Sequence, residues 1–115
     1  MKILVCGSRT FTDVDLLEEV LSKQDNGISI TIISGGARGA DRLAEAWANK
    51  YGFNKVIYHA DWDTHGKSAG FIRNQQMIDE NPDLVVAFWD GKSKGTKHTL
   101  GLAKQKKIRT LLVYF

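Results

Sequence analysis

Residues 29–41 read SITIISGGARGAD, an apolar run that passes directly into a glycine-rich polar loop. The run Ser29–Ile33 is rich in β-branched residues and has the length of a buried strand. The segment that follows, Arg38–Tyr51, carries Leu43 and Trp47 on one helical face. A strand, a glycine-bearing loop and a helix in direct succession predict the first half of a β-α-β unit.

The same alternation extends over the whole chain. Four further apolar runs predict strands, at Ile3–Cys6, Lys55–His59, Leu84–Phe88 and Thr110–Tyr114. Three further periodic segments predict helices, at Asp13–Gln24, Ala69–Glu80 and Thr96–Lys106, the first with Thr12 and Asp15 spaced as a capping box. Strict alternation predicts a Rossmann-like, three-layer α/β fold with helices on both faces of a five-stranded, mainly parallel sheet. The common strand order is then 3-2-1-4-5, and we expect residues 1–115 to form one such domain.

The composition is that of an ordinary globular protein. Of the 115 residues, 43% are hydrophobic and 25% are charged. No apolar run approaches the roughly 18 residues of a membrane span, and the first residues are typical of a strand rather than a signal peptide. The single cysteine, Cys6, cannot form an internal disulfide, and the three histidines lack metal-ligand spacing. We therefore expect a cytoplasmic protein without a metal, a cofactor or a membrane partner.

Positive charge is concentrated in the last quarter of the chain. After Asp90 the sequence has seven basic residues and no acidic one: Lys92, Lys94, Lys97, Lys104, Lys106, Lys107 and Arg109. Such a cluster favours an anionic partner. The lysines at 104, 106 and 107 are equally well explained as the solvated face of a helix.

Three of the four strand-to-helix loops combine glycines with polar residues: Gly7–Thr10, Ser34–Asp41 and Asp90–Thr96. In the predicted order they follow three adjacent strands, so they converge on one crevice beyond the strand ends. Each loop alone is typical of a structural turn, but together their glycines and helix N-termini favour phosphate. We expect ligand contacts from Gly7, Ser8, Arg9, Ser34, Gly35, Gly36, Arg38, Gly39, Asp41, Gly91, Ser93, Gly95 and Thr96.

The segment between the third strand and the third helix adds side chains at the edge of this crevice. Lys67, Arg73 and Asn74 are placed to contact a ligand from the side. Trp62 or Trp89 offers a flat surface on which a base can stack, and we count Trp89 among the expected ligand contacts. Packing in the core or between subunits explains either tryptophan equally well.

None of the loops matches a standard nucleotide-binding motif. Residues 66–68, GKS, have the end of a Walker A sequence, but Asp61 stands where its first glycine belongs. Ser34 replaces the first glycine of the dinucleotide fingerprint G-x-G-x-x-G, of which only the last two glycines are present. These departures argue against an ordinary ATPase or an NAD(P) oxidoreductase.

Asp41 and Asp90 are the candidate catalytic residues. Asp41 lies in the first turn of a predicted helix, where a carboxylate complements the helix dipole. A carboxylate there would also repel phosphate. A functional Asp41 would therefore bind a ribose hydroxyl or act as an acid or base.

Four stretches carry a family resemblance, in order along nearly the whole chain: Gly7–Asp13, Ser34–Asp41, Gly66–Asn74 and Gly91–Thr96. They resemble the YspA/YpsA-related branch of the SLOG superfamily. That superfamily has a Rossmann-like fold and includes LOG nucleotide phosphoribohydrolases, DNA-processing proteins and sensors of ADP-ribose-derived signals. The resemblance implies a nucleotide-derived ligand. It also implies a homo-oligomer, a dimer or larger, for which Trp62, Phe71 and Trp89 are candidate apolar contacts.

One departure from the LOG pattern bears on activity. LOG enzymes carry P-G-G-x-G-T-x-x-E with a catalytic glutamate, whereas this chain lacks the proline and has Thr99 at the glutamate position. The leading hypothesis is therefore sensing or sequestration of a phosphate-bearing nucleotide derivative, such as one of ADP-ribose type. The alternative is an N-glycosidase for nucleoside monophosphates that uses Asp41 or Asp90. A third is single-stranded nucleic-acid binding through the basic last quarter and Trp89.

Overall fold

The structure, a computed structural model, describes all 115 residues. Its elements, in order, are β1 (Lys2–Gly7), α1 (Val14–Ser22), β2 (Thr31–Ser34), α2 (Ala40–Tyr51), β3 (Asn54–Ile57), α3 (Trp62–His65), a 3₁₀ turn η1 (Gly66–Ser68), α4 (Ala69–Asp79), β4 (Leu84–Trp89), α5 (Lys94–Gln105) and β5 (Thr110–Tyr114). The strands form one sheet in the order β3-β2-β1-β4-β5, and every neighbouring pair is parallel. The predicted fold class and strand order are both confirmed.

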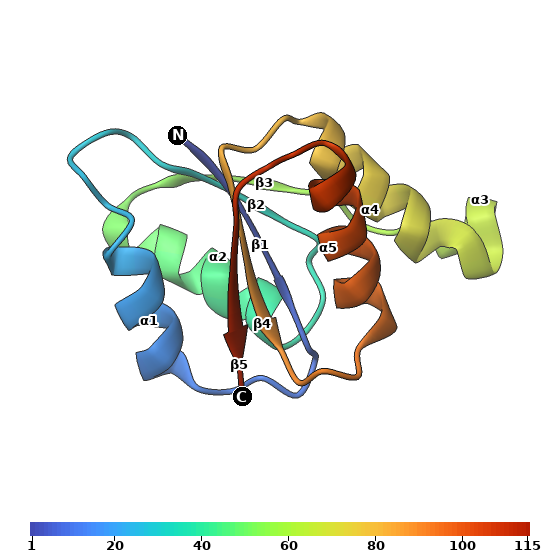
Figure 1. The fold of residues 1–115 in the computed structure, drawn as a ribbon, viewed down its shortest axis with the longest axis horizontal. Coiled ribbons are helices and arrows are strands. Elements are labelled where there is room, and N and C mark those ends of the chain that lie inside the picture. Colours follow the sequence, from blue (N-terminus) through green and yellow to red (C-terminus); the bar gives the residue numbers. More distant parts are fainter.

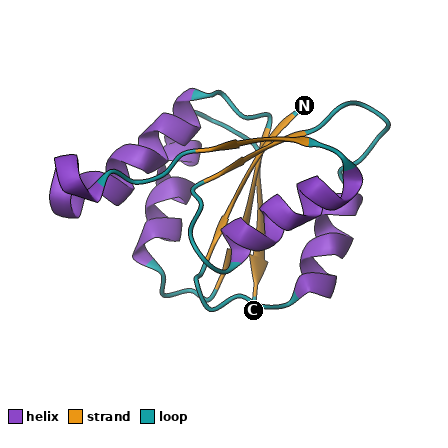
Figure 2. Cartoon of the chain, turned by 180° about the vertical axis from the view of Figure 1, so that it is seen from behind, coloured by secondary structure: helices purple, strands orange, loops and turns teal.

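The sheet lies between two layers of helices (Figure 1, Figure 2). Helices α1 and α2 cover one face, and α4 and α5 cover the other. Because successive side chains of a strand point to opposite faces, β1 buries Ile3 and Val5 on the α1/α2 side and Leu4 and Cys6 on the α4/α5 side. Burial on both faces is typical of a central strand in a parallel sheet.

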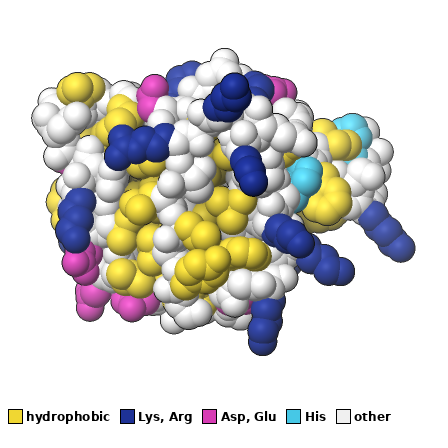
Figure 3. Space-filling model, in the orientation of Figure 1, with side chains coloured by type: hydrophobic (Ala, Val, Ile, Leu, Met, Phe, Trp, Pro, Cys, Tyr) yellow, Lys and Arg dark blue, Asp and Glu magenta, His cyan; other side chains and the backbone are white.

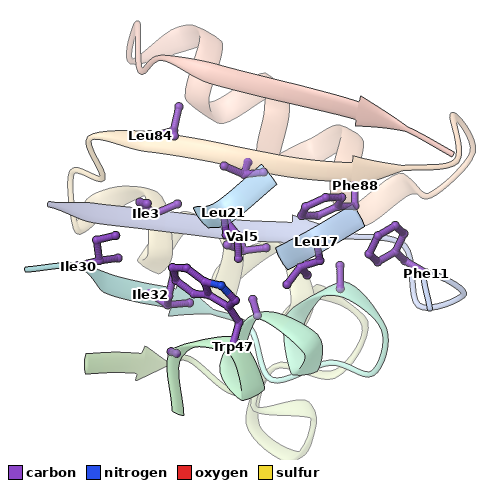
Figure 4. Close-up of a cluster of buried hydrophobic side chains, with 14 residues drawn as sticks. Ile3, Val5, Phe11, Leu17, Leu21, Ile30, Ile32, Trp47, Leu84 and Phe88 are labelled. Atoms are coloured by element: carbon purple, nitrogen blue, oxygen red, sulfur yellow. The ribbon is translucent and has the colours of Figure 1, made fainter. Parts of the chain in front are cut away.

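The larger core fills the space between the sheet, α1 and α2 (Figure 4). Phe11, which follows β1, stacks on Phe88 of β4 with the ring centroids 4.7 Å apart. Trp47 of α2 packs near Phe53 at the opposite end, with centroids 5.2 Å apart. The Phe11–Phe88 contact holds the loop after β1 against the end of β4, where the candidate site lies.

The two edge strands are exposed. No residue of β3 is buried, and Tyr114 of β5 keeps 63% of its surface accessible. Figure 3 shows hydrophobic side chains gathered over the β5 edge, with lysine and arginine side chains around them. Buried strands are therefore limited to the three at the centre of the sheet. None of the helices combines the length and apolar character needed to cross a bilayer.

Helix starts differ from the predicted ones because the N-cap residues differ. The predicted capping box is wrong: Asp13 caps α1 by accepting a hydrogen bond from the Leu16 N–H at 3.0 Å. Its own carboxylate is a strong cap, which leaves Thr12 outside the helix. Helix α5 begins two residues earlier than predicted, because Ser93 is its N-cap. The four-residue helix α3 was not predicted; it starts after Asp61, whose carboxylate accepts from the Thr64 N–H.

Gly39 brings the start of α2 against the loop after β1. Its φ is +84°, and a Cβ atom on it would stand 2.4 Å from the backbone oxygen of Ser8. That oxygen accepts hydrogen bonds from the N–H groups of Phe11 at 3.1 Å and Ala40 at 3.5 Å. Only glycine permits both this φ and this contact. The two glycine-rich loops meet here.

We predict that Gly39→Ala destabilises the fold by about 3 kcal/mol or more, since it adds overpacking to backbone strain. Gly52→Ala is the matched control: Gly52 also has a positive φ, +72°, but a Cβ on it would meet nothing within 4 Å. Strain alone at Gly52 costs about 1–2 kcal/mol. Urea unfolding of both variants measures the difference. Equal losses of stability would show that the contact with Ser8 is not tight.

Candidate functional site

A cavity of about 310 Å³ opens at the carboxyl ends of β1 and β4. This is the point where the chain order of the sheet reverses, and where parallel α/β sheets place ligands. Ten of the residues singled out from the sequence line it: Gly7, Ser8, Arg9, Asp41, Arg73, Asn74, Asp90, Ser93, Gly95 and Thr96. Five residues that were not among the expected ligand contacts complete the wall: Cys6, Thr10, Ala37, Met77 and Thr99.

The loop after β1 is tied down at Ser8 and open at its tip. The Ser8 N–H donates to the Phe88 backbone oxygen at 2.9 Å, and its Oγ accepts from the Asp90 N–H at 3.2 Å. The N–H groups of the next two residues, Arg9 and Thr10, donate to no protein atom. Both residues line the cavity. Free backbone N–H groups beside an arginine are an arrangement that suits an anion.

The Asp90 loop turns the chain into α5. The Oδ1 atom of Asp90 accepts from the N–H groups of Lys92 at 2.8 Å and Ser93 at 2.9 Å. These two hydrogen bonds hold the pKa of Asp90 below its ordinary value, so this carboxylate is ionised. The N–H of Gly95, in the first turn of α5, has no protein acceptor. Helix α5 therefore presents its N-terminus at the cavity wall.

Helix α4 supplies Arg73 and Asn74, which join the other two sides of the cavity. Arg73 donates from Nη1 to the Gly35 backbone oxygen at 2.8 Å and from Nε to Asn74 Oδ1 at 3.1 Å. Asn74 donates from Nδ2 to the Gly95 backbone oxygen at 3.3 Å. The loop after β2 and the start of α5 are thus fixed to the same pair of side chains.

Asp41 is the one buried carboxylate of the site, with 7% of its surface accessible. Its Oδ2 accepts from the Ala37 N–H at 3.2 Å. Burial raises the pKa of Asp41 to about 6, against the opposing effects of that hydrogen bond and of the nearby Arg73 guanidinium. Burial and the proximity of Asp41 also raise the pKa of the Cys6 thiol, which leaves it protonated and unreactive.

Eight of the expected ligand contacts lie outside the cavity wall: Ser34, Gly35, Gly36, Arg38, Gly39, Lys67, Trp89 and Gly91. Ser34 is buried and donates to Glu45 Oε2 at 2.6 Å. Arg38 and Lys67 are exposed on the surface. Trp89 donates from Nε1 to the Ser93 backbone oxygen at 3.1 Å and packs on Tyr114. These residues support the loops or face solvent. No group of three His, Cys, Asp or Glu side chains is arranged to hold a metal ion.

Comparison with known proteins identifies the family of this chain. Residues 1–65 match the model of the YspA, cpYpsA-related SLOG family. The chain belongs to this SLOG family. The matched residues of this SLOG protein run from β1 to the end of α3 and include the loops after β1 and β2.

Two similar proteins extend the comparison. The SLOG chain is 37% identical to the Gene 61 protein of Mycobacterium phage D29, an alignment that covers 93% of the chain and 91% of the phage protein. The fold of the SLOG chain is similar to that of the DNA processing protein A (DprA) from Streptococcus pneumoniae, with a TM-score of 0.56 and 17% identity. The superposition covers 97% of the SLOG chain but 58% of DprA, so the chain spans little more than half of that protein. At this identity the likeness concerns the fold alone.

Burial of Asp41 predicts a pH dependence of stability. Because its folded pKa of about 6 exceeds the ordinary 3.8, folding takes up a proton between these values. The contribution of Asp41 to stability is therefore largest below about pH 4 and is lost as the pH rises through about 6. We expect Asp41→Asn to remove this loss, so that the variant gains on the order of 3 kcal/mol over the wild type between pH 4 and pH 7.

Urea unfolding at a series of pH values measures this difference. Asp90→Asn is the control, because the pKa of Asp90 is lowered instead and its contribution to stability has the opposite sign. If the free energies of unfolding of the wild type and of Asp41→Asn change in parallel from pH 4 to pH 7, the raised pKa of Asp41 is contradicted.

Proposed function

We propose that this SLOG protein binds a phosphate-bearing nucleotide derivative in the cavity, and that residues 1–115 act as one nucleotide-binding domain that senses or sequesters it. The observation that carries the proposal is the convergence of unbonded backbone N–H groups from the loop after β1 and the start of α5 on a cavity lined by two arginines. Backbone N–H groups and guanidinium groups are the donors that phosphate prefers in proteins.

Two kinds of group in the cavity suit two parts of such a ligand. Phosphate is favoured beside Arg9, Thr10 and Gly95, where the backbone N–H groups are unbonded. Asp41 lies next to Arg73 and Gly35. A carboxyl group that is partly protonated near neutral pH can accept from or donate to a sugar hydroxyl without repelling the rest of the ligand. A phosphorylated ribose, as in ADP-ribose-type compounds, combines both features.

Nucleotide binding is tested with a panel of nucleoside monophosphates, ADP-ribose and ribose 5-phosphate, read by thermal shift and calorimetry. A ligand at a hundredfold excess over its Kd should stabilise the fold by about 2.7 kcal/mol. Arg9→Ala should weaken phosphate-bearing ligands about tenfold or more, because it removes a hydrogen bond to a charged group. Arg38→Ala is the matched control, since Arg38 is also an exposed loop arginine but lies outside the cavity wall.

No shift with any compound would refute the proposal. An oligonucleotide that binds more tightly than every mononucleotide, with affinity falling steeply as salt rises, would favour nucleic-acid binding instead.

One observation favours an enzymatic alternative, the N-glycosidase. Two carboxylates line the same cavity with pKa values displaced in opposite directions, Asp41 upward and Asp90 downward. Such a pair separates acid and base roles. Asp41 could protonate the departing base while ionised Asp90 stabilises the positive charge of the ribosyl group, and water then adds to give ribose 5-phosphate.

The glycosidase alternative predicts release of free base from nucleoside monophosphates. Release should be lost in both Asp41→Asn and Asp90→Asn, because each keeps the size of the side chain but not its proton chemistry. High-performance liquid chromatography of single-turnover mixtures measures it. Intact nucleotide after prolonged incubation with excess protein would eliminate this alternative and leave binding as the function.

A further inference from the structure

The cavity offers no flat apolar surface to a base. Its hydrophobic wall residues are Cys6, Ala37 and Met77, and no aromatic side chain lines it. The remaining wall residues are hydrogen-bonding or charged groups and glycines, which suit phosphate and sugar. Bases bind proteins largely by stacking on aromatic side chains. The base of a nucleotide held here must therefore find its surface outside the cavity.

Of the three tryptophans, one presents a free face. Trp47 is in the core, and the Trp89 ring packs on Tyr114 with its N–H bonded to Ser93. Trp62 keeps 53% of its surface accessible, on helix α3, which protrudes beyond α4 (Figure 1). Hydrophobic side chains lie at the surface over α3 and the start of α4 (Figure 3). An exposed tryptophan at a protruding turn has no role in the core.

Trp62 stands next to the cavity through Gly70 and Arg73. A Cβ atom on Gly70 would lie 3.5 Å from Cη2 of Trp62 and 3.9 Å from Nη2 of Arg73. Arg73 lines the cavity, and its Nη1 and Nε are held by Gly35 and Asn74. Its Nη2 donates to no protein atom. The edge of the indole and the free end of the guanidinium therefore both lie beside Gly70, and Arg73 connects this point to the cavity wall.

We propose that Trp62 is the base-stacking residue of this site, and that its ligand is a base-bearing nucleoside phosphate rather than a bare sugar phosphate. The assignment rests on the proposed function and gives Trp62 the role expected of Trp89. Phosphate and ribose occupy the cavity, and the base passes Arg73 and lies on the indole. None of the residues of α3 is buried, so this turn can adjust to bring the ring against the base.

The test compares ligands with and without a base on the full chain. Calorimetry measures the affinities of AMP, the other nucleoside monophosphates, ADP-ribose and ribose 5-phosphate for the wild type, Trp62→Ala and Trp62→Phe. We expect Trp62→Ala to weaken the best nucleotide by roughly 5- to 150-fold, which corresponds to about 1–3 kcal/mol per stacked base. Ribose 5-phosphate should bind both proteins equally, and Trp62→Phe should keep most of the affinity.

Phe71→Ala is the matched control. Phe71 is as exposed as Trp62, at 51%, and lies on the adjacent helix, but its ring packs on His98. It should leave nucleotide affinity unchanged. Nucleotides that bind no more tightly than ribose 5-phosphate, or a Trp62→Ala variant with wild-type nucleotide affinity, would overturn the assignment while the proposed function stands. A protein that binds none of these compounds would overturn both.

Discussion

The pairing of β1 with β4 is the constraint on which the site depends. Five residue pairs run from Ile3 opposite Leu84 to Gly7 opposite Phe88, and a Cβ on Gly7 would stand 2.4 Å from the Phe88 backbone oxygen. The two strands therefore end side by side with almost no space between their backbones. The chain leaves β1 toward α1 on one face and leaves β4 toward α5 on the other. This divergence opens the cavity, because no helix can fill the space directly above both strand ends.

The cavity wall is polar, but several of its side chains already make hydrogen bonds within the protein. This limits which groups of the wall can bind a ligand. Ser8, Asp90 and Ser93 use their side chains to close turns, and Arg73 with Asn74 links loops that are far apart in sequence. The donors left without a protein partner are mostly backbone N–H groups, whose positions are set by the elements that carry them. Asp41 differs from these groups, because it is a carboxylate that is buried where its charged form is disfavoured. A buried group that costs stability at neutral pH is typical of a functional site rather than of the scaffold.

The fold could be predicted from the sequence because the five strands and the four longer helices each have a recognisable residue pattern, and strict alternation allows few topologies. The strand order β3-β2-β1-β4-β5 places the loops after β2, β1 and β4 next to one another, so their convergence could be predicted as well. The differences between prediction and structure mainly concern the direction in which side chains point. The sequence predicts Trp89 just beyond the fourth strand, but it is the last residue of β4. Alternation along the strand, with Phe88 on the α1 side, turns it toward α5, where the Ser93 oxygen accepts from its N–H. Thr99 and Met77 lie three residues after Thr96 and Asn74, on the same helical faces, and this spacing could have identified them. The raised pKa of Asp41 could not be foreseen, since it depends on burial of the carboxyl group in the folded chain.

Thr99, at the position where the LOG pattern has its glutamate, puts a hydroxyl instead of a carboxylate at the cavity wall. It lines the cavity, almost fully buried, and its hydroxyl donates to the Gly95 backbone oxygen at 3.2 Å within α5. A neutral hydroxyl cannot take up a proton from water near neutral pH or balance positive charge on a sugar ring, as a carboxylate can. Any hydrolysis would therefore fall to Asp41 and Asp90. Asp90 already gives Oδ1 to two backbone N–H groups that fix the turn. The wall thus combines backbone N–H groups that have no protein partner with carboxylates that are buried or hydrogen-bonded within the loop, and the proposed binding function rests on this arrangement.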